Sequence, residues 1–126
     1  MTVNVTPFLR NALLLDAAGS GVVGIMLLAA PAMLADLFGL PQRLLLVVAI
    51  GIFGWVAMLV LGARRPTLPS MLAWTFVLGN AGYVVASFGI LLLGLVHPTM
   101  LGVLFVCAQA MAVALFTVLQ WLALRG

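Results

Sequence analysis

Residues 8–30 read FLRNALLLDAAGSGVVGIMLLAA, an apolar run that contains a single acidic residue, Asp16. A helix that crosses a lipid bilayer needs about 20 mostly apolar residues, and this run is long enough. Three further runs, at about 44–62, 71–96 and 99–124, have the same character. They are continuously apolar rather than alternating, which indicates helices and not the strands of a barrel. We therefore predict an all-α membrane protein whose four transmembrane helices form an up-down-up-down bundle.

The composition supports lipid as the solvent. Hydrophobic residues make up 67% of the chain and charged residues only 6%, whereas a typical soluble domain carries about a quarter charged residues. A small soluble domain buries only about two-thirds of the surface of its chain, so it could not hide this much apolar area. We predict a single transmembrane domain over residues 1–126. The few positive charges are scattered, which argues against a nucleic-acid partner.

The arginines indicate how the chain is oriented. An even number of spans places both termini on one side, and that side holds Arg10, Arg64, Arg65 and Arg125, against Arg43 alone on the other. Cytoplasmic loops carry an excess of arginine and lysine. We therefore expect the N- and C-termini to be cytoplasmic. The first run is too long and too polar at its centre for a signal peptide, so we expect it to stay as a span.

The predicted connections are short. The longest, residues 31–43, contains a stretch at 32–38 that could form one or two helical turns at the membrane interface. Gly39 suits a helix end, and Pro41 suits the first turn of the next helix. Residues 97–98, His-Pro, are expected to make a tight turn between the last two spans. Because no loop could fold on its own, any site must lie within the bundle or at its rims.

The most informative residues are the polar ones inside the spans. Charged and amide side chains within a membrane face the bundle interior, because exposure to lipid is costly. Asp16 and Asn80 lie at similar depth in spans that run the same way, so we expect Asp16 to reach Asn80 or Ser87. Six residues form the predicted proton- or ligand-binding seam: Asp16, Ser20, Asn80, Tyr83, Gln109 and Gln120.

Several roles for this seam remain open at this stage. Interhelical hydrogen bonds could simply fix helix register, at about 0.6 kcal/mol per contact. Asp16 could instead bind a proton or a cation, or act as the counter-charge to a basic substrate. It could also pair with Arg10 or Arg65 reaching inward, which would make it structural.

Other chemistry has little support in the sequence. His97 is the only histidine and Cys107 the only cysteine, and neither has the neighbours that a zinc or haem site requires. There is no phosphate-binding glycine loop, nucleophile elbow or pair of acids. We therefore expect a protein that is not an enzyme and that has no metal or cofactor.

Two stretches carry a resemblance to a known group of proteins. Residues 13–21, LLLDAAGSG, and residues 101–110, LGVLFVCAQA, followed by Leu119-Gln120-Trp121, resemble a family of small uncharacterised four-span bacterial inner-membrane proteins. That resemblance implies the four-span fold, a location in the bacterial inner (cytoplasmic) membrane, and no particular activity. The architecture is also loosely similar to that of small multidrug resistance transporters, in which an acid of the first span couples drug and proton exchange. Asp16 matches that position, but the surrounding motif is absent.

The sequence favours a non-enzymatic inner-membrane protein, an accessory or oligomer-forming subunit with a mainly structural polar seam. Its expected partners are membrane lipids and either further copies of itself or a larger membrane complex. The alternative is a proton-coupled transporter of small molecules or lipophilic cations that uses Asp16. A third hypothesis is a binder of a lipid, quinone or pigment, oriented by Tyr83, Trp55 and the amide side chains.

Overall fold

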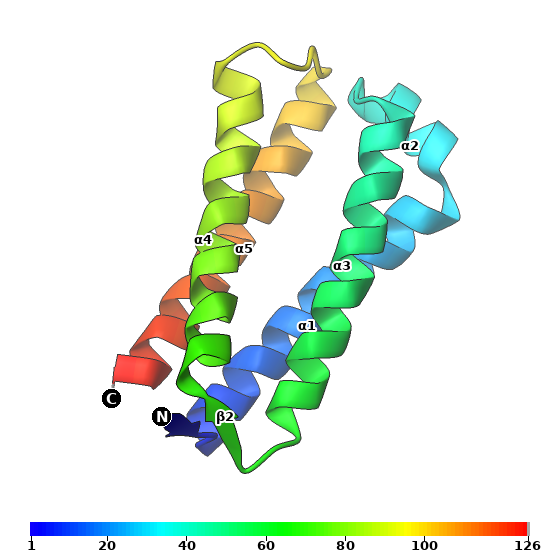
Figure 1. Cartoon of the computed structure of the whole chain (residues 1–126). Coiled ribbons are helices and arrows are strands. Elements are labelled where there is room, and N and C mark those ends of the chain that lie inside the picture. The colour runs from blue at the N-terminus through cyan, green and yellow to red at the C-terminus, as the bar shows by residue number, and fades with distance from the viewer. Residues whose placement is uncertain (126) are drawn as a thin grey trace.

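A computed structural model describes residues 1–125 and confirms the helical bundle (Figure 1). Four of its helices are long and apolar enough to cross a membrane. The elements in chain order are β1 (Thr2–Asn4), α1 (Pro7–Ala29), α2 (Pro31–Phe38), α3 (Gln42–Ala63), β2 (Thr67–Pro69), α4 (Ser70–Leu92) and α5 (Met100–Arg125). The short helix α2 lies where the sequence indicated one or two helical turns.

Local sequence explains where the first helices begin and end. The Thr6 hydroxyl accepts a hydrogen bond from the Leu9 N–H at 3.2 Å and so caps α1, with Pro7 in its first turn. Pro31 cannot continue α1 and begins α2 instead. Gly39 has a φ of 67°, a left-handed conformation that ends α2 at little cost because glycine has no Cβ.

The predicted end of the third span is wrong. We expected that span to reach Val96 and to turn at His97-Pro98, but α4 ends at Leu92 and residues 93–99 form a longer connection. Gly94, with a φ of 69°, follows the helix and ends it, as glycine commonly does. Pro41 also differs slightly from the prediction, because it is the extended cap residue before α3 rather than part of the first turn.

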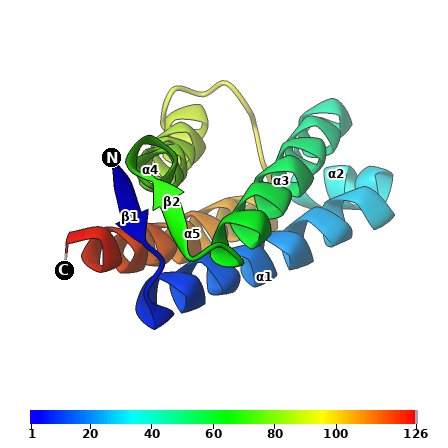
Figure 2. The same ribbon diagram turned by 60° about the horizontal axis from the view of Figure 1, so that its bottom comes forward.

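A small antiparallel sheet closes one end of the bundle, and the sequence did not predict it (Figure 2). Val3 pairs with Leu68, between the outer pairs Thr2–Pro69 and Asn4–Thr67. Strands of three residues are too short to show an alternating pattern, which is why they were missed. Leu68 is fully buried, so the sheet contributes to the core.

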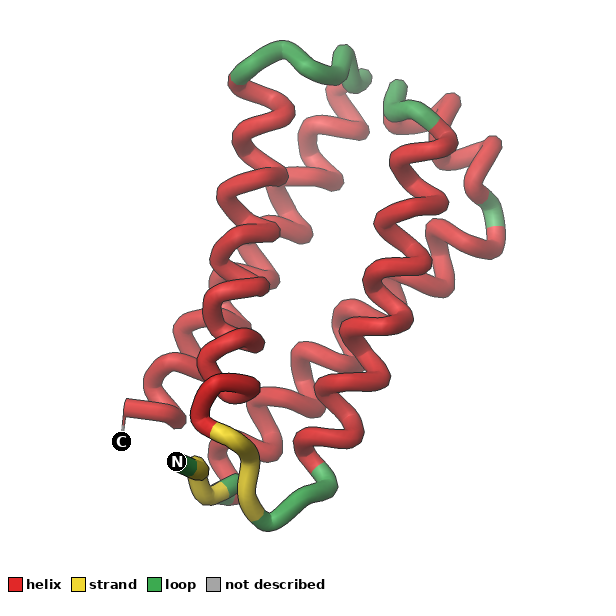
Figure 3. The backbone as a smooth tube through the Cα atoms, viewed as in Figure 1, coloured by secondary structure: helices red, strands yellow, loops and turns green. Residues whose placement is uncertain are grey.

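The four long helices form two pairs (Figures 1 and 3). Helix α1 packs along α3, and α4 packs along α5, while contact between α1 and α5 joins the two pairs. The backbones of α3 and α4 have almost no contact. Both ends of the described chain lie at the same end of the bundle (Figure 1).

Many of the buried apolar residues form two clusters. One cluster, near the sheet, contains Leu9, Leu13, Leu59, Leu68 and Phe76 among others. The other, near α2, is built on Leu27, Leu34, Phe38, Leu45, Ala49 and Val106 and their neighbours. Large apolar side chains also cover the outside of every long helix, as expected for a surface that faces lipid.

Helix α2 packs very closely on the start of α5. The Thr99 N–H donates to the Phe38 carbonyl at 2.9 Å, and its hydroxyl donates to the Leu37 carbonyl at 2.8 Å. A Cβ added to Gly102 would lie 2.0 Å from the Phe38 carbonyl oxygen, so only glycine fits there. This contact fixes one end of α5 against the α2–α3 connection.

Candidate functional site

Asp16 is fully buried and accepts hydrogen bonds from three helices. The Asn80 amide donates to its Oδ2 at 2.7 Å, and the Gln120 amide donates to the same oxygen at 2.8 Å. The Ser20 hydroxyl, one turn along α1, donates to Oδ1 at 3.0 Å. These contacts link α1, α4 and α5, and we call the four residues the Asp16 network. A carboxylate is an acceptor only, so three donors suit it.

All three partners of Asp16 are neutral side chains. Arg10, one of the arginines considered as an ion-pair partner, instead donates from Nε to the Ala63 carbonyl at 2.8 Å. That carbonyl belongs to the last turn of α3, where helix carbonyls have no partner within the helix. Arg10 therefore ties the start of α1 to the end of α3 and leaves Asp16 to the amides.

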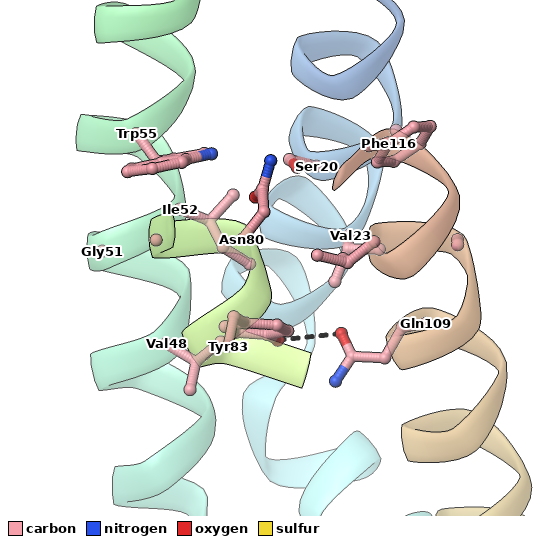
Figure 4. A pocket seen from close by; sticks show the side chains of 14 residues that line it. Ser20, Val23, Val48, Gly51, Ile52, Trp55, Asn80, Tyr83, Gln109 and Phe116 are labelled. Carbon is pink, nitrogen blue, oxygen red and sulfur yellow. Dashed lines mark hydrogen bonds between the residues drawn. The ribbon is translucent and has the colours of Figure 1, made fainter. Parts of the chain in front are cut away.

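A second polar pair lies one helical turn along α4. The Tyr83 hydroxyl donates to Gln109 Oε1 at 2.9 Å, which joins α4 to α5 (Figure 4). The Gln109 amide nitrogen makes no hydrogen bond to another residue in the described chain. The Ser87 hydroxyl donates to the Tyr83 carbonyl at 2.7 Å within α4, so Ser87 does not reach Asp16.

A cavity of about 390 Å³ lies beside these groups, between the two core clusters. Every long helix contributes to its wall, which is mostly apolar. The lining residues are Gly19, Ser20, Val23, Val48, Gly51, Ile52, Trp55, Gly79, Asn80, Tyr83, Gln109, Ala112, Val113 and Phe116. Figure 4 shows Trp55, Asn80 and Phe116 at one end and Tyr83 with Gln109 at the other. This size and lining are typical of small-molecule sites.

Two glycines and a tryptophan border the cavity where α3 and α4 stand apart. Gly51 on α3 and Gly79 on α4 both line the cavity and are exposed. The Trp55 indole spans the space between the helices, because a Cβ on Gly79 would lie only 2.5 Å from its Cη2 atom. The same indole meets Phe76 edge-on at 5.6 Å between ring centroids. Trp55 therefore bridges α3 and α4 at one end of the cavity.

The structure brings the six predicted seam residues into two groups. Asp16, Ser20, Asn80 and Gln120 share one network, and Tyr83 pairs with Gln109. The predicted proximity of Asp16 and Asn80 is confirmed, while the role of the seam in binding protons or ligands stays a prediction. Of the six, four line the cavity, whereas Asp16 and Gln120 stand behind it.

The cavity wall formed by α3 was only partly anticipated. Trp55 had been considered as a group that could orient a ligand, but Val48, Gly51 and Ile52 had not. Apolar residues on a transmembrane helix give no signal of their own, because lipid-facing and cavity-facing positions have the same composition. A weak signal was Gly51, because a glycine leaves that position of α3 without a side chain.

Comparisons with protein-family models, with curated proteins and with solved structures found no match to this chain. The family resemblance noted above therefore stays an expectation, and what the chain does must be argued from its geometry. The four-span helical architecture is the part of that expectation that the structure supports.

Proposed function

We propose that this protein binds a lipophilic small molecule inside its four-helix bundle. The observation that carries the proposal is the cavity, which all four long helices line and which combines apolar walls with a few fixed polar groups. Such a combination buries an apolar ligand body and orients it by a small number of hydrogen bonds. The sequence alone favoured an accessory or oligomer-forming role, and the cavity shifts the emphasis to binding.

The packing supports access from the lipid. Helices α3 and α4 stand apart, and beside the Trp55 bridge the exposed Gly51 lines the cavity with no atom within 4 Å of an added Cβ. A ligand dissolved in the bilayer could enter between these helices without crossing water. The Asp16 network lies behind the cavity and joins α1 to α4 and α5, so its main role in this proposal is to hold the walls in place.

The test is to fill the cavity and look for loss of a bound molecule. Gly51 lines the cavity and has no atom within 4 Å of an added Cβ, so Gly51→Leu can place a side chain there without a clash at the backbone. Gly54→Leu is the matched control, because Gly54 has the same space on the same helix but does not line the cavity.

We expect native mass spectrometry of gently solubilised protein to show a bound lipophilic molecule in the wild type and in Gly54→Leu. The Gly51→Leu variant should carry much less of it, with the same helical content. Equal occupancy in all three proteins would refute binding in this cavity. A stable complex with other subunits and no small molecule would favour the accessory role instead.

One observation favours a second candidate function, proton-coupled transport of a lipophilic cation. Asp16 has only neutral partners, and two of them, Ser20 and Asn80, also line the cavity. A cation in the cavity would therefore sit near a buried carboxyl group. This function requires that lipophilic cations stabilise the wild type more at high pH than at low pH and have no such effect on Asp16→Asn, because an amide cannot titrate.

A further inference from the structure

The hydrogen bonds around the cavity determine which groups remain for a ligand. Asn80 uses both hydrogens of its amide, one on Asp16 Oδ2 at 2.7 Å and one on Gln120 Oε1 at 3.1 Å. An asparagine side chain has two donor hydrogens and one carbonyl oxygen. Asn80 lines the cavity, so it can offer a ligand only its oxygen, as an acceptor.

Gln109 offers a ligand the opposite kind of hydrogen-bonding group from the one that Asn80 offers. Its oxygen accepts from the Tyr83 hydroxyl at 2.9 Å, whereas its amide nitrogen has no hydrogen-bond partner in residues 1–125. Gln109 also lines the cavity, so the group that it offers is a donor. The cavity therefore has an acceptor at the Asn80 end and a donor at the Gln109 end (Figure 4).

The acceptor and the donor lie at different heights along α4, because Gln109 pairs with Tyr83 rather than with Asn80. Asn80 and Tyr83 are three residues apart on α4, which corresponds to a rise of about 4.5 Å. Between the two ends the wall is apolar, with Val23 and Ile52 on facing helices (Figure 4). The indole of Trp55 lies at the acceptor end and adds a flat aromatic surface. A ring with a hydroxyl on one side and a second oxygen on the opposite side offers a donor toward Asn80, an acceptor toward Gln109 and apolar faces toward the wall between them.

We propose that the ligand is a phenol- or quinol-type ring, with a hydroxyl that donates to Asn80 and a second oxygen that accepts from Gln109. This inference rests on the proposed function and names the class of molecule bound. An oxidised quinone has two acceptors and no donor, so one of its oxygens would face the Asn80 oxygen without a hydrogen between them. An unmade hydrogen bond in a buried site lowers affinity by about tenfold or more.

Asp16 is a positioning residue in this scheme. By accepting from the Asn80 amide, it holds the nitrogen of that amide away from the cavity and leaves the oxygen for the ligand. The preference for a donor on the ligand therefore depends on a residue that does not line the cavity itself.

A series of ring probes tests the polarity without changing the protein. The probes are decylhydroquinone, its monomethyl ether, its dimethyl ether and decylquinone, each titrated calorimetrically into the full chain in mild detergent without oxygen. The hydroquinone and its monomethyl ether keep a donor and an acceptor, so we expect both to bind. The dimethyl ether and the quinone have no donor and should bind at least about tenfold more weakly.

Two variants assign the two ends. Gln109→Leu should weaken the binding of the hydroquinone and of the quinone alike, because both can accept a hydrogen bond from Gln109. Asn80→Leu should weaken the binding of the hydroquinone alone, and so remove the preference for the hydroquinone over the quinone. Asp16→Leu should reduce the preference as well, a result that a purely structural role for Asp16 would not give.

The outcomes separate this inference from the proposed function. Equal binding of the hydroquinone and the quinone to the wild type, lost in Gly51→Leu, would overturn the polarity and leave binding in the cavity intact. Absence of binding by all four probes to the wild type would overturn the ring class. If the Gly51→Leu comparison also showed no bound molecule in any protein, the proposed function would fail with it.

Discussion

Replacing Asp16 with leucine removes the centre of the hydrogen-bond network while keeping a side chain of similar length. Three contacts disappear, from Ser20, Asn80 and Gln120. Polar contacts within membrane bundles contribute about 0.6 kcal/mol each, so Asp16→Leu should lower the free energy of unfolding by about 2 kcal/mol. The loss in free energy of unfolding should be no larger than this, because Asn80 can still donate a hydrogen bond to Gln120.

Asp16→Asn is the matched control for hydrogen-bonding shape. Its remaining oxygen can accept from both amides, as Oδ2 does in the wild type, and its new amide can donate to the Ser20 hydroxyl. We therefore expect a loss of no more than about 0.6 kcal/mol, the value of one contact. Ser20→Ala removes a single contact and should give a similar small loss.

The assay is reversible unfolding in mixed micelles of mild detergent and SDS, followed by circular dichroism. If Asp16→Leu were as stable as the wild type, the network would contribute nothing to packing and its presence would need a functional reason. If Asp16→Asn lost as much as Asp16→Leu, an amide could not replace the carboxyl group of Asp16, and the reasoning from hydrogen-bonding shape would be refuted.

Three further predictions concern packing, the cavity and orientation. Gly102→Ala should destabilise the fold by about 1–3 kcal/mol in the same assay, because the new Cβ would meet the Phe38 carbonyl, whereas Gly82→Ala, which has open space, should not. Gly79→Ala should displace the Trp55 indole, shift the tryptophan emission and weaken ligand binding, and an unchanged spectrum would contradict the contact. Reporter fusions at both termini should show a cytoplasmic location, and a periplasmic C-terminus would refute the arginine-based orientation.

The helical bundle could be predicted because lipid imposes a simple rule. Each span must satisfy its own backbone and be about 20 residues long, so length and apolar character were enough to find four spans. The ends of the spans were less certain where apolar residues continue past the helix. Residues 93–96 illustrate this, since Leu93 and Leu95 look like part of a span although Gly94 has already ended the helix.

The polar half of the site was predictable, and the apolar half was not. A buried acid and a buried amide in neighbouring spans have few ways to avoid lipid, so Asp16 and Asn80 were expected to meet. The cavity exists because α3 and α4 do not pack against each other. The spacing of apolar residues in the spans does not predict which helices pack together. The close packing of Gly79 against Trp55 could not be predicted, because the two residues lie on different helices and only the folded structure shows that they touch.

The pairing of β1 with β2 has a consequence for assembly in the membrane. The partner of Val3 is Leu68, which is synthesised only after α1 and α3. Until then, the residues ahead of the first span have no strand to join. The two strands can meet only if both spans have crossed and returned to the same face of the bilayer. If the first span were inserted in the reverse direction while the second kept its orientation, β1 and β2 would lie on opposite sides of the membrane and could not pair. The sheet therefore stabilises the arrangement in which the first two spans are correctly inserted, and it does not stabilise one in which the first span is reversed.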